Sequence, residues 1–205
     1  MSGLFHYYRF PRFREIAFLL WPLLFLKLSL EKATLRTLAI LRPGKILEIG
    51  GGWGKFARKM ALLLPESNIL SVDNEARMTK VALKGARLAN LRFRTGDFYR
   101  ISGQTQCVVL FGLFVMLWPP DAAMKQLFNI TGESAIVTFT GFNWFTRSLV
   151  IFHRLTTGAD IHPIEPEEFQ HLALRAGFKS CAVIPVHPFE RSYIAVLQKG
   201  SKEAK

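Results

Sequence analysis

The chain has 205 residues, half of them hydrophobic, and a formal net charge of +12. This length fits one domain with an additional segment, and the charge favours an anionic partner, either nucleic acid or a negatively charged membrane surface. Cys107 and Cys181 lie in apolar runs with no zinc-ligand neighbour at a usable spacing, which excludes a zinc site built on them and favours buried, reduced thiols.

The first forty residues differ from the rest of the chain. A basic, aromatic stretch at 6–15 precedes an uncharged run of eleven residues from Ile16 to Leu26, which Pro22 interrupts. The run is too short to cross a bilayer, which needs about 20 apolar residues, and no small-x-small cleavage site follows it. Segment 1–40 is therefore predicted to be helical. It either lies in a membrane interface or covers the domain core or a dimer partner, and hydrophobicity alone leaves both alternatives open.

Between residues 41 and 200, short apolar runs alternate with amphipathic helical patterns. This alternation predicts an α/β domain with a doubly wound, mostly parallel, seven-stranded sheet and helices on both faces. Two strands close together near the end predict an antiparallel strand near one edge, and residues 201–205 are predicted to be a disordered tail. The strands are predicted at 45–50, 68–73, 91–97, 107–117 including a continuation of the strand, 134–142, 179–186 and 191–199. The helices are predicted at 55–64, 74–90, 119–132 and 164–178, the last of them capped by Gly177.

Four glycines and a tryptophan follow the first predicted strand, in the stretch LEIGGGWGK at 47–55. Between a strand and a helix, this loop occupies the sheet edge where such folds bind ligands. Gly50 is expected to allow the tight turn, Gly52 to let the backbone approach a ligand, and Gly54 to permit close packing as the helix begins. A dinucleotide fingerprint is disfavoured, because it would need a glycine where Lys55 stands. A structural glycine turn in an unrelated α/β protein is the alternative.

Residues 42–200 resemble the class I S-adenosylmethionine-dependent methyltransferases. The matching stretches are KILEIGGGWGKFA, ILSVDNEARM, RFRTGDF and the final strand pair after EEFQHLALRAGF. The resemblance implies S-adenosylmethionine as cofactor and S-adenosylhomocysteine as product. It assigns the methionine end to Glu48 and the loop glycines, the ribose to Asp73, and the adenine to Asp97, with Phe98 beside the base. The predicted cofactor-binding residues are Glu48, Gly50, Gly52, Trp53, Gly54, Asp73, Asn74, Asp97, Phe98 and Gly112, and no metal is expected.

The acceptor determines whether a catalytic base is needed. The sulfonium is already activated, so methyl transfer mostly needs alignment and a dry pocket. An amine or phenol must also lose a proton. His162 is the first candidate base, because it follows the fifth strand, where this family often builds its acceptor pocket; Tyr8 and His153 are further candidates, and a solvated loop histidine is the alternative. The Asn-Pro-Pro-Tyr signature of base methylators is absent after the fourth strand.

A second aromatic, apolar segment at 141–158 carries Arg147 and Arg154. It either packs on the core or, with segment 1–40, flanks the cofactor cleft. Arginine suits a phosphate, and rings suit a lipid tail or isoprenoid. The predicted function is therefore methylation of a lipophilic acceptor, such as the headgroup amine of phosphatidylethanolamine or a quinone precursor. The enzyme would lie on the cytoplasmic side of a membrane, peripherally bound to an anionic surface. An RNA methyltransferase and a non-catalytic scaffold are the alternatives.

Overall fold

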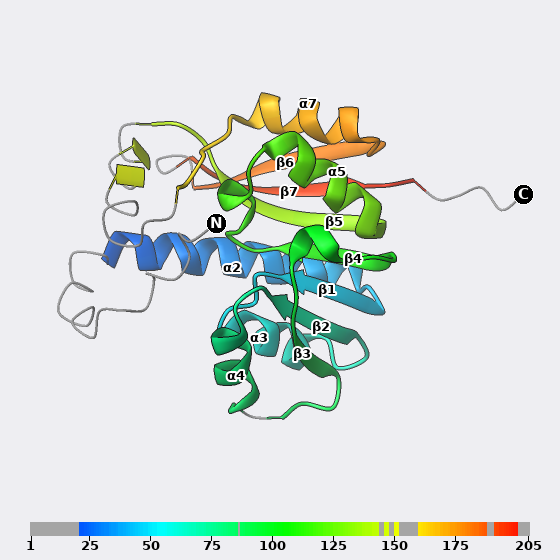
Figure 1. The fold of residues 1–205 in the computed structure, drawn as a ribbon. Coiled ribbons are helices and arrows are strands. Elements are labelled where there is room, and N and C mark those ends of the chain that lie inside the picture. The colour runs from blue at the N-terminus through cyan, green and yellow to red at the C-terminus, as the bar shows by residue number, and fades with distance from the viewer. Residues whose placement is uncertain are drawn as a thin grey trace, which may run out of the picture.

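The computed structural model describes residues 21–85, 87–143, 146–147, 150–151, 160–187 and 191–200. They form one seven-stranded sheet between two layers of helices (Figure 1). The strands are β1 (Lys45–Ile49), β2 (Asn68–Asp73), β3 (Leu91–Thr95), β4 (Thr105–Leu110), β5 (Thr131–Thr140), β6 (Ser180–His187) and β7 (Ser192–Gln198). The helices are α2 (Trp21–Leu41), α3 (Lys55–Leu63), α4 (Ala76–Leu83), α5 (Pro120–Ile130) and α7 (Pro166–Ala176), with 3-10 turns η2 (Phe98–Arg100) and η3 (Phe114–Met116).

The strand order is β3-β2-β1-β4-β5-β7-β6. The first five strands in this order are parallel, and β7 runs antiparallel to both of its neighbours. The apolar run of β4 is buried on both faces of the sheet, as a central parallel strand requires. The predicted fold class is therefore confirmed, including the antiparallel strand near one edge.

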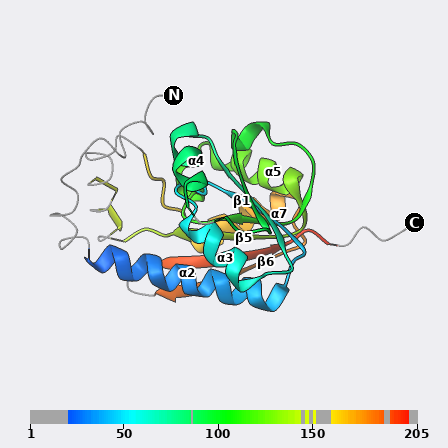
Figure 2. The same ribbon diagram turned by 90° about the horizontal axis from the view of Figure 1, so that it is seen from below.

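Two hydrophobic clusters hold the layers together. On one face of the sheet, side chains of α2 and α3 pack against β1, β2 and β4, with Leu38 and Met60 fully buried. On the other face, α5 and α7 cover the sheet, and the Phe169 ring stacks on Phe139 at 4.3 Å between ring centroids. Figure 2 shows the same layers from below, with α3 lying between α2 and α4.

Helix α2 is part of the domain along its second half. Leu30, Thr34 and Leu38 recur every four residues and are buried, and Thr34 Oγ1 donates to the Leu30 carbonyl at 2.8 Å. The predicted boundary at residue 40 falls in the last turn of this helix. Residues 28–41 thus follow the alternative in which the segment covers the core. Among the described residues, no helix has the length and hydrophobicity that a bilayer crossing requires.

Two predicted helix ends differ from the structure. The helix predicted at 74–90 ends at Leu83, where the Ala82 carbonyl accepts from the Gly85 N–H at 3.3 Å and also from the Arg58 guanidinium. The helix predicted to end at Gly132 ends at Ile130, and Gly132 lies inside β5. A Cβ on Gly132 would lie 3.1 Å from the Thr105 carbonyl oxygen, so glycine permits the close approach of β5 to the start of β4.

Candidate functional site

The glycine loop follows β1, at the point where strand order reverses. From β1 the sheet continues to β2 and β3 on one side and to β4 and β5 on the other side. In a doubly wound sheet, ligands bind at such a point, beyond the carboxyl ends of the strands. Gly50, Gly52 and Gly54 all have positive φ, at 77°, 53° and 70°. The Gly50 N–H donates to the Val72 carbonyl at 2.8 Å, which fixes the loop on β2. Side chains with a Cβ rarely adopt these angles, which explains the glycines.

The glycines of this loop divide into two kinds. A Cβ on Gly51 would lie 1.9 Å from Ser71 Oγ, and one on Gly54 would lie 2.5 Å from the Phe93 ring. These two positions are closed by packing within the protein, as expected of Gly54. Gly52 is different, because a Cβ there would meet no atom within 4 Å. Its backbone faces open space, which is what approach of a ligand to the backbone requires.

Glu48 lies beneath the loop and is 2% exposed. Its Oε2 accepts a hydrogen bond of 2.5 Å from Ser71 Oγ, on the residue opposite it in the register of β1 and β2. Burial raises the pKa of Glu48 to about 7; the Ser71 hydrogen bond lowers it and the charge of Asp73 raises it further. Both the neutral and the ionised carboxyl are therefore populated near pH 7 in the absence of a ligand.

Asp73 connects the end of β2 to the glycine loop. Its Oδ2 accepts from the Gly52 N–H at 2.8 Å, and its Oδ1 accepts from the Glu75 N–H at 2.9 Å. Each carboxylate oxygen has a second lone pair, so the group can still accept from a ribose hydroxyl while it orders the loop. The neighbouring Asn74 is exposed. The arrangement fits the predicted ribose-binding role of Asp73.

Asp97 and Phe98 follow β3. Asp97 Oδ1 accepts from the Tyr99 N–H at 3.0 Å and so caps η2, while its Oδ2 lies 3.8 Å from Arg100 Nε. The Phe98 ring is buried in the hydrophobic cluster under α5, so most of its surface is covered by protein. The adenine contacts predicted for these two residues stay predictions.

Gly112 follows β4, the strand that pairs with β1. It has a φ of 68°, its N–H donates to Thr138 Oγ1 at 2.7 Å, and a Cβ there would meet no atom within 4 Å. The adjacent Leu113 side chain covers Gly50, since a Cβ on that glycine would lie 3.0 Å from Leu113 Cδ2. Trp53 is exposed, with Lys55 Nζ 5.4 Å from its ring centroid.

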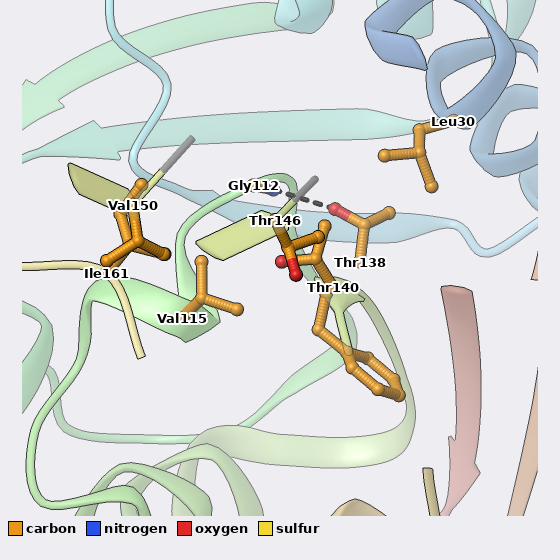
Figure 3. Close-up of a pocket in the computed structure, with 9 residues that line it drawn as sticks. Leu30, Gly112, Val115, Thr138, Thr140, Thr146, Val150 and Ile161 are labelled. Atoms are coloured by element: carbon orange, nitrogen blue, oxygen red, sulfur yellow. Dashed lines mark hydrogen bonds between the residues drawn. The ribbon is translucent and has the colours of Figure 1, made fainter. Parts of the chain in front are cut away.

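A cavity of about 130 Å³ lies beside Gly112, at the carboxyl ends of β4 and β5. Figure 3 shows Leu30 of α2 and Val150 of the segment after β5 approaching it from opposite sides. The lining is apolar apart from three threonine side chains, and none of the described residues that form it is charged. Its members are Leu30, Gly112, Val115, Thr138, Phe139, Thr140, Thr146, Val150 and Ile161.

His162 lies next to this cavity without lining it. The backbone N–H of His162 donates to the Val115 carbonyl at 2.7 Å. The neighbouring Ile161 lines the cavity. The imidazole ring lies against Trp118, with 4.4 Å between ring centroids. Its role as a base stays a prediction. The other two candidate bases, Tyr8 and His153, lie outside the described residues.

Three residues of the site are not predicted from the sequence. Gly51 packs against Ser71 and Glu48, Ser71 donates to Glu48, and Thr138 accepts from the Gly112 N–H. Ser71 could have been identified as a candidate, because it is a polar residue in the middle of the apolar strand NILSVD. Its partner could not be inferred, since the pairing depends on the register between β1 and β2.

Comparisons with known proteins agree with this geometry. Residues 46–133 match the model of a methyltransferase domain. The S-adenosylmethionine-dependent methyltransferase SibL is 15% identical with a TM-score of 0.72, over 83% of this chain and 55% of that one. Magnesium protoporphyrin IX methyltransferase from Synechocystis PCC 6803, with bound S-adenosylhomocysteine, is 15% identical with a TM-score of 0.67, over 83% and 82%. Human N-acetylserotonin methyltransferase, in complex with S-adenosylmethionine, is 17% identical with a TM-score of 0.64, over 85% and 52%.

The chain thus spans about half the length of two of these three structures. No curated protein sequence gives a significant match. At these identities the solved structures establish the fold, and the domain match covers β1 to the start of β5, which contains the glycine loop, Asp73 and Gly112.

Proposed function

We propose that this chain, a class I S-adenosylmethionine-dependent methyltransferase by domain and by fold, methylates a small lipophilic acceptor that carries an aromatic ring. One observation carries the proposal: an apolar cavity lies beside Gly112 at the carboxyl ends of β4 and β5, and the next side chain, Leu113, lies against Gly50 of the glycine loop. In a doubly wound sheet this edge is where ligands bind, so cofactor and acceptor would meet there.

The residues present fit the cofactor. S-adenosylmethionine supplies a methyl group that is already activated on a sulfonium. The open space at Gly52 and Gly112 leaves room against the backbone, and Asp73 retains acceptor capacity for ribose hydroxyls. Glu48 places a carboxyl beneath the loop, where its ionised form would attract a cationic cofactor. These residues bind and orient the cofactor, and the chain's apolar side chains exclude water from the cavity.

The size and lining of the cavity favour a ring over a phospholipid headgroup. An engineered protein cavity of about 150 Å³ holds one benzene molecule, which is close to the volume found here. A phosphate would meet no charged partner among the described lining residues, and burying an unpaired charge is unfavourable. The threonine hydroxyls offer hydrogen bonds for a phenolic or quinone oxygen. A quinone precursor is therefore preferred to phosphatidylethanolamine.

Delivery from a membrane fits the elements around the cavity. Leu30 belongs to the helix that continues the apolar N-terminal run, and Val150 belongs to the aromatic segment after β5. Figures 1 and 2 both place the N-terminal end of α2 on the side of the molecule where β5 ends. An acceptor with an isoprenoid tail would pass between two apolar elements. RNA is disfavoured, since an apolar cavity of this size offers no charged contact to a nucleotide phosphate.

A methyl-transfer assay tests the proposal. The full chain would be incubated with S-adenosylmethionine labelled in its methyl group and with a detergent-solubilised prenylated phenol, phosphatidylethanolamine or RNA in separate reactions. Labelling of the phenol is expected. Labelling of only phosphatidylethanolamine or RNA would contradict the proposed acceptor, while failure to bind S-adenosylhomocysteine in calorimetry would favour the scaffold alternative.

A cavity-filling variant makes the assay specific to the site. Ile161→Phe adds volume in the cavity wall, and Ile184→Phe adds the same volume on the exposed edge strand β6. We expect Ile161→Phe to raise KM for the phenol at least 10-fold with unchanged affinity for S-adenosylhomocysteine, and Ile184→Phe to behave like the wild type. Equal kinetics for the two variants would place the acceptor elsewhere.

A further inference from the structure

Among the described helices, positive charge is concentrated on one layer. Helices α2, α3 and α4 contain eight Lys and Arg residues and one acidic residue. Helices α5 and α7, on the other face of the sheet, contain two basic and three acidic residues. The two sides of the domain therefore differ strongly in electrostatic potential, which a net charge alone does not reveal.

The same layer exposes large apolar side chains among its charges. Ile40 is 82% exposed and Leu62 is 69% exposed, whereas the described side chains of α5 and α7 include one such residue, Leu174. We define the basic helical face by its exposed members on these helices and at the C-cap of α4. The cations are Lys32, Arg36, Lys55, Lys59, Arg77, Lys80 and Lys84, and the apolar residues are Leu28, Ile40, Leu62, Leu63, Val81 and Leu83.

The three helices form one continuous surface. Lys59 of α3 pairs with Glu31 of α2, and Arg58 of α3 donates to the Ala82 carbonyl of α4. Glu31, the acidic residue of these helices, is thereby neutralised by a neighbour. Both ribbon views show α3 between the other two helices. The cations and leucines of the basic helical face therefore act together on a partner.

We propose that the basic helical face binds the surface of an anionic lipid bilayer. Basic residues interleaved with leucine and isoleucine are the composition of interfacial helices, in which the cations contact lipid phosphates and the apolar chains enter the acyl boundary. A nucleic acid is disfavoured, because binding single strands uses exposed aromatic rings for stacking. In residues 28–41 of α2 and in α3 and α4, the one aromatic residue is Phe56, which is buried, and the exposed Trp53 before α3 is a single ring beside Lys55.

The position of α2 connects this face to the cavity. Leu30 lines the cavity. Leu28 and Lys32, which lie two residues before and two residues after it, are exposed on the basic helical face. One helix thus separates the bilayer-binding surface from the acceptor cavity, which would let a membrane-borne ring enter beside it. This geometry deepens the proposed function and rests on it for the acceptor, whereas bilayer binding itself needs no methyl transfer.

Vesicle co-sedimentation tests the inference. The full chain would be mixed with vesicles of phosphatidylcholine, with and without phosphatidylglycerol. The variants are Arg77→Gln/Lys80→Gln/Lys84→Gln for the charges of the basic helical face and Leu62→Ser/Leu83→Ser for its apolar residues. The matched control on the opposite layer is Lys125→Gln/Arg175→Gln/Leu174→Ser. Circular dichroism and urea unfolding of every variant show whether the domain remains folded.

The wild type and the control are expected to bind anionic vesicles much more strongly than neutral ones. The triple charge variant should lose on the order of 100-fold in partitioning, since each cation near such a surface contributes about 1 kcal/mol. The leucine variant should also lose binding. The inference would be overturned if the charge variant and the leucine variant both bound vesicles as strongly as the wild type. It would also be overturned if the charge variant lost binding to RNA but kept binding to vesicles. The detergent assay above contains no bilayer, so failure of the acceptor proposal is recorded separately.

Discussion

Ser71 donates a 2.5 Å hydrogen bond to the buried carboxyl of Glu48, and the two residues pair directly in the register of β2 and β1. Gly51 of the glycine loop packs directly against this pair, since a Cβ there would lie 1.9 Å from Ser71 Oγ and 2.9 Å from Glu48 Oε2. The pair therefore couples the protonation of Glu48 to the geometry of the loop.

Glu48 should make stability fall as the pH rises. Its pKa is 4.5 in the reference state and about 7 in the folded protein, mainly because of burial. Between these values the unfolded chain releases the proton and the folded protein keeps it, so the free energy of unfolding decreases with pH and levels off above about 7. Urea unfolding at a series of pH values should show this fall, by up to about 3 kcal/mol, and Glu48→Gln should flatten it. If the free energy of unfolding depended on pH in the same way in the wild type and in Glu48→Gln, this role of Glu48 would be contradicted.

Gly51→Ala should destabilise the protein by about 1–3 kcal/mol, because its new Cβ would lie 1.9 Å from Ser71 Oγ. Ser71→Ala removes that oxygen, so the double variant Gly51→Ala/Ser71→Ala should recover part of the loss. Denaturant unfolding of the four proteins gives the interaction energy from a double-mutant cycle. Strict additivity of the two changes would show that the clash is relieved by movement elsewhere.

Asp73→Ala should weaken S-adenosylhomocysteine binding at least 10-fold. The substitution removes the predicted ribose acceptor and also the partner of the Gly52 N–H. Asp121→Ala is the control, because it removes an exposed aspartate from α5, where its partner is Arg175. Isothermal calorimetry compares the three proteins. Wild-type affinity in Asp73→Ala would mean that the cofactor assignment of this residue is wrong.

Leu38→Ala should lower the free energy of unfolding by about 2–5 kcal/mol, as expected for a core leucine. Leu38 is fully buried between α2 and the sheet, whereas Ile40 on the same helix is 82% exposed. Ile40→Ala should therefore change stability by less than about 0.5 kcal/mol. Urea midpoints measure both. Equal values for the two variants would contradict the packing of α2 on the domain.

His162→Phe tests the predicted base. The substitution keeps an aromatic ring against Trp118 but removes the proton acceptor, so kcat for a phenolic acceptor should fall about 100-fold with unchanged S-adenosylhomocysteine affinity. His171→Phe, at an exposed position of α7, should keep the wild-type rate. A normal kcat and pH profile in His162→Phe would exclude this histidine as the base.

The sequence by itself determined the fold class, which the structure confirms, and it indicated a methyltransferase domain with S-adenosylmethionine as cofactor, which the domain match at residues 46–133 supports. These features depend on local patterns: apolar strand and amphipathic helix alternate, and the glycine loop lies within nine consecutive residues. The cap at Gly177, with a φ of 112°, is local in the same sense.

The tertiary structure decided which residues meet. Ser71 contacts Glu48 because two strands pair in one register, and the Ala82 carbonyl near the end of α4 accepts from Arg58, a side chain of α3. Gly51 and Gly52 are identical in sequence terms, yet one is closed by packing and the other faces open space. Such differences arise from contacts between segments far apart in the chain, which periodicity and spacing do not encode, and they place the cavity between α2 and the ends of β4 and β5.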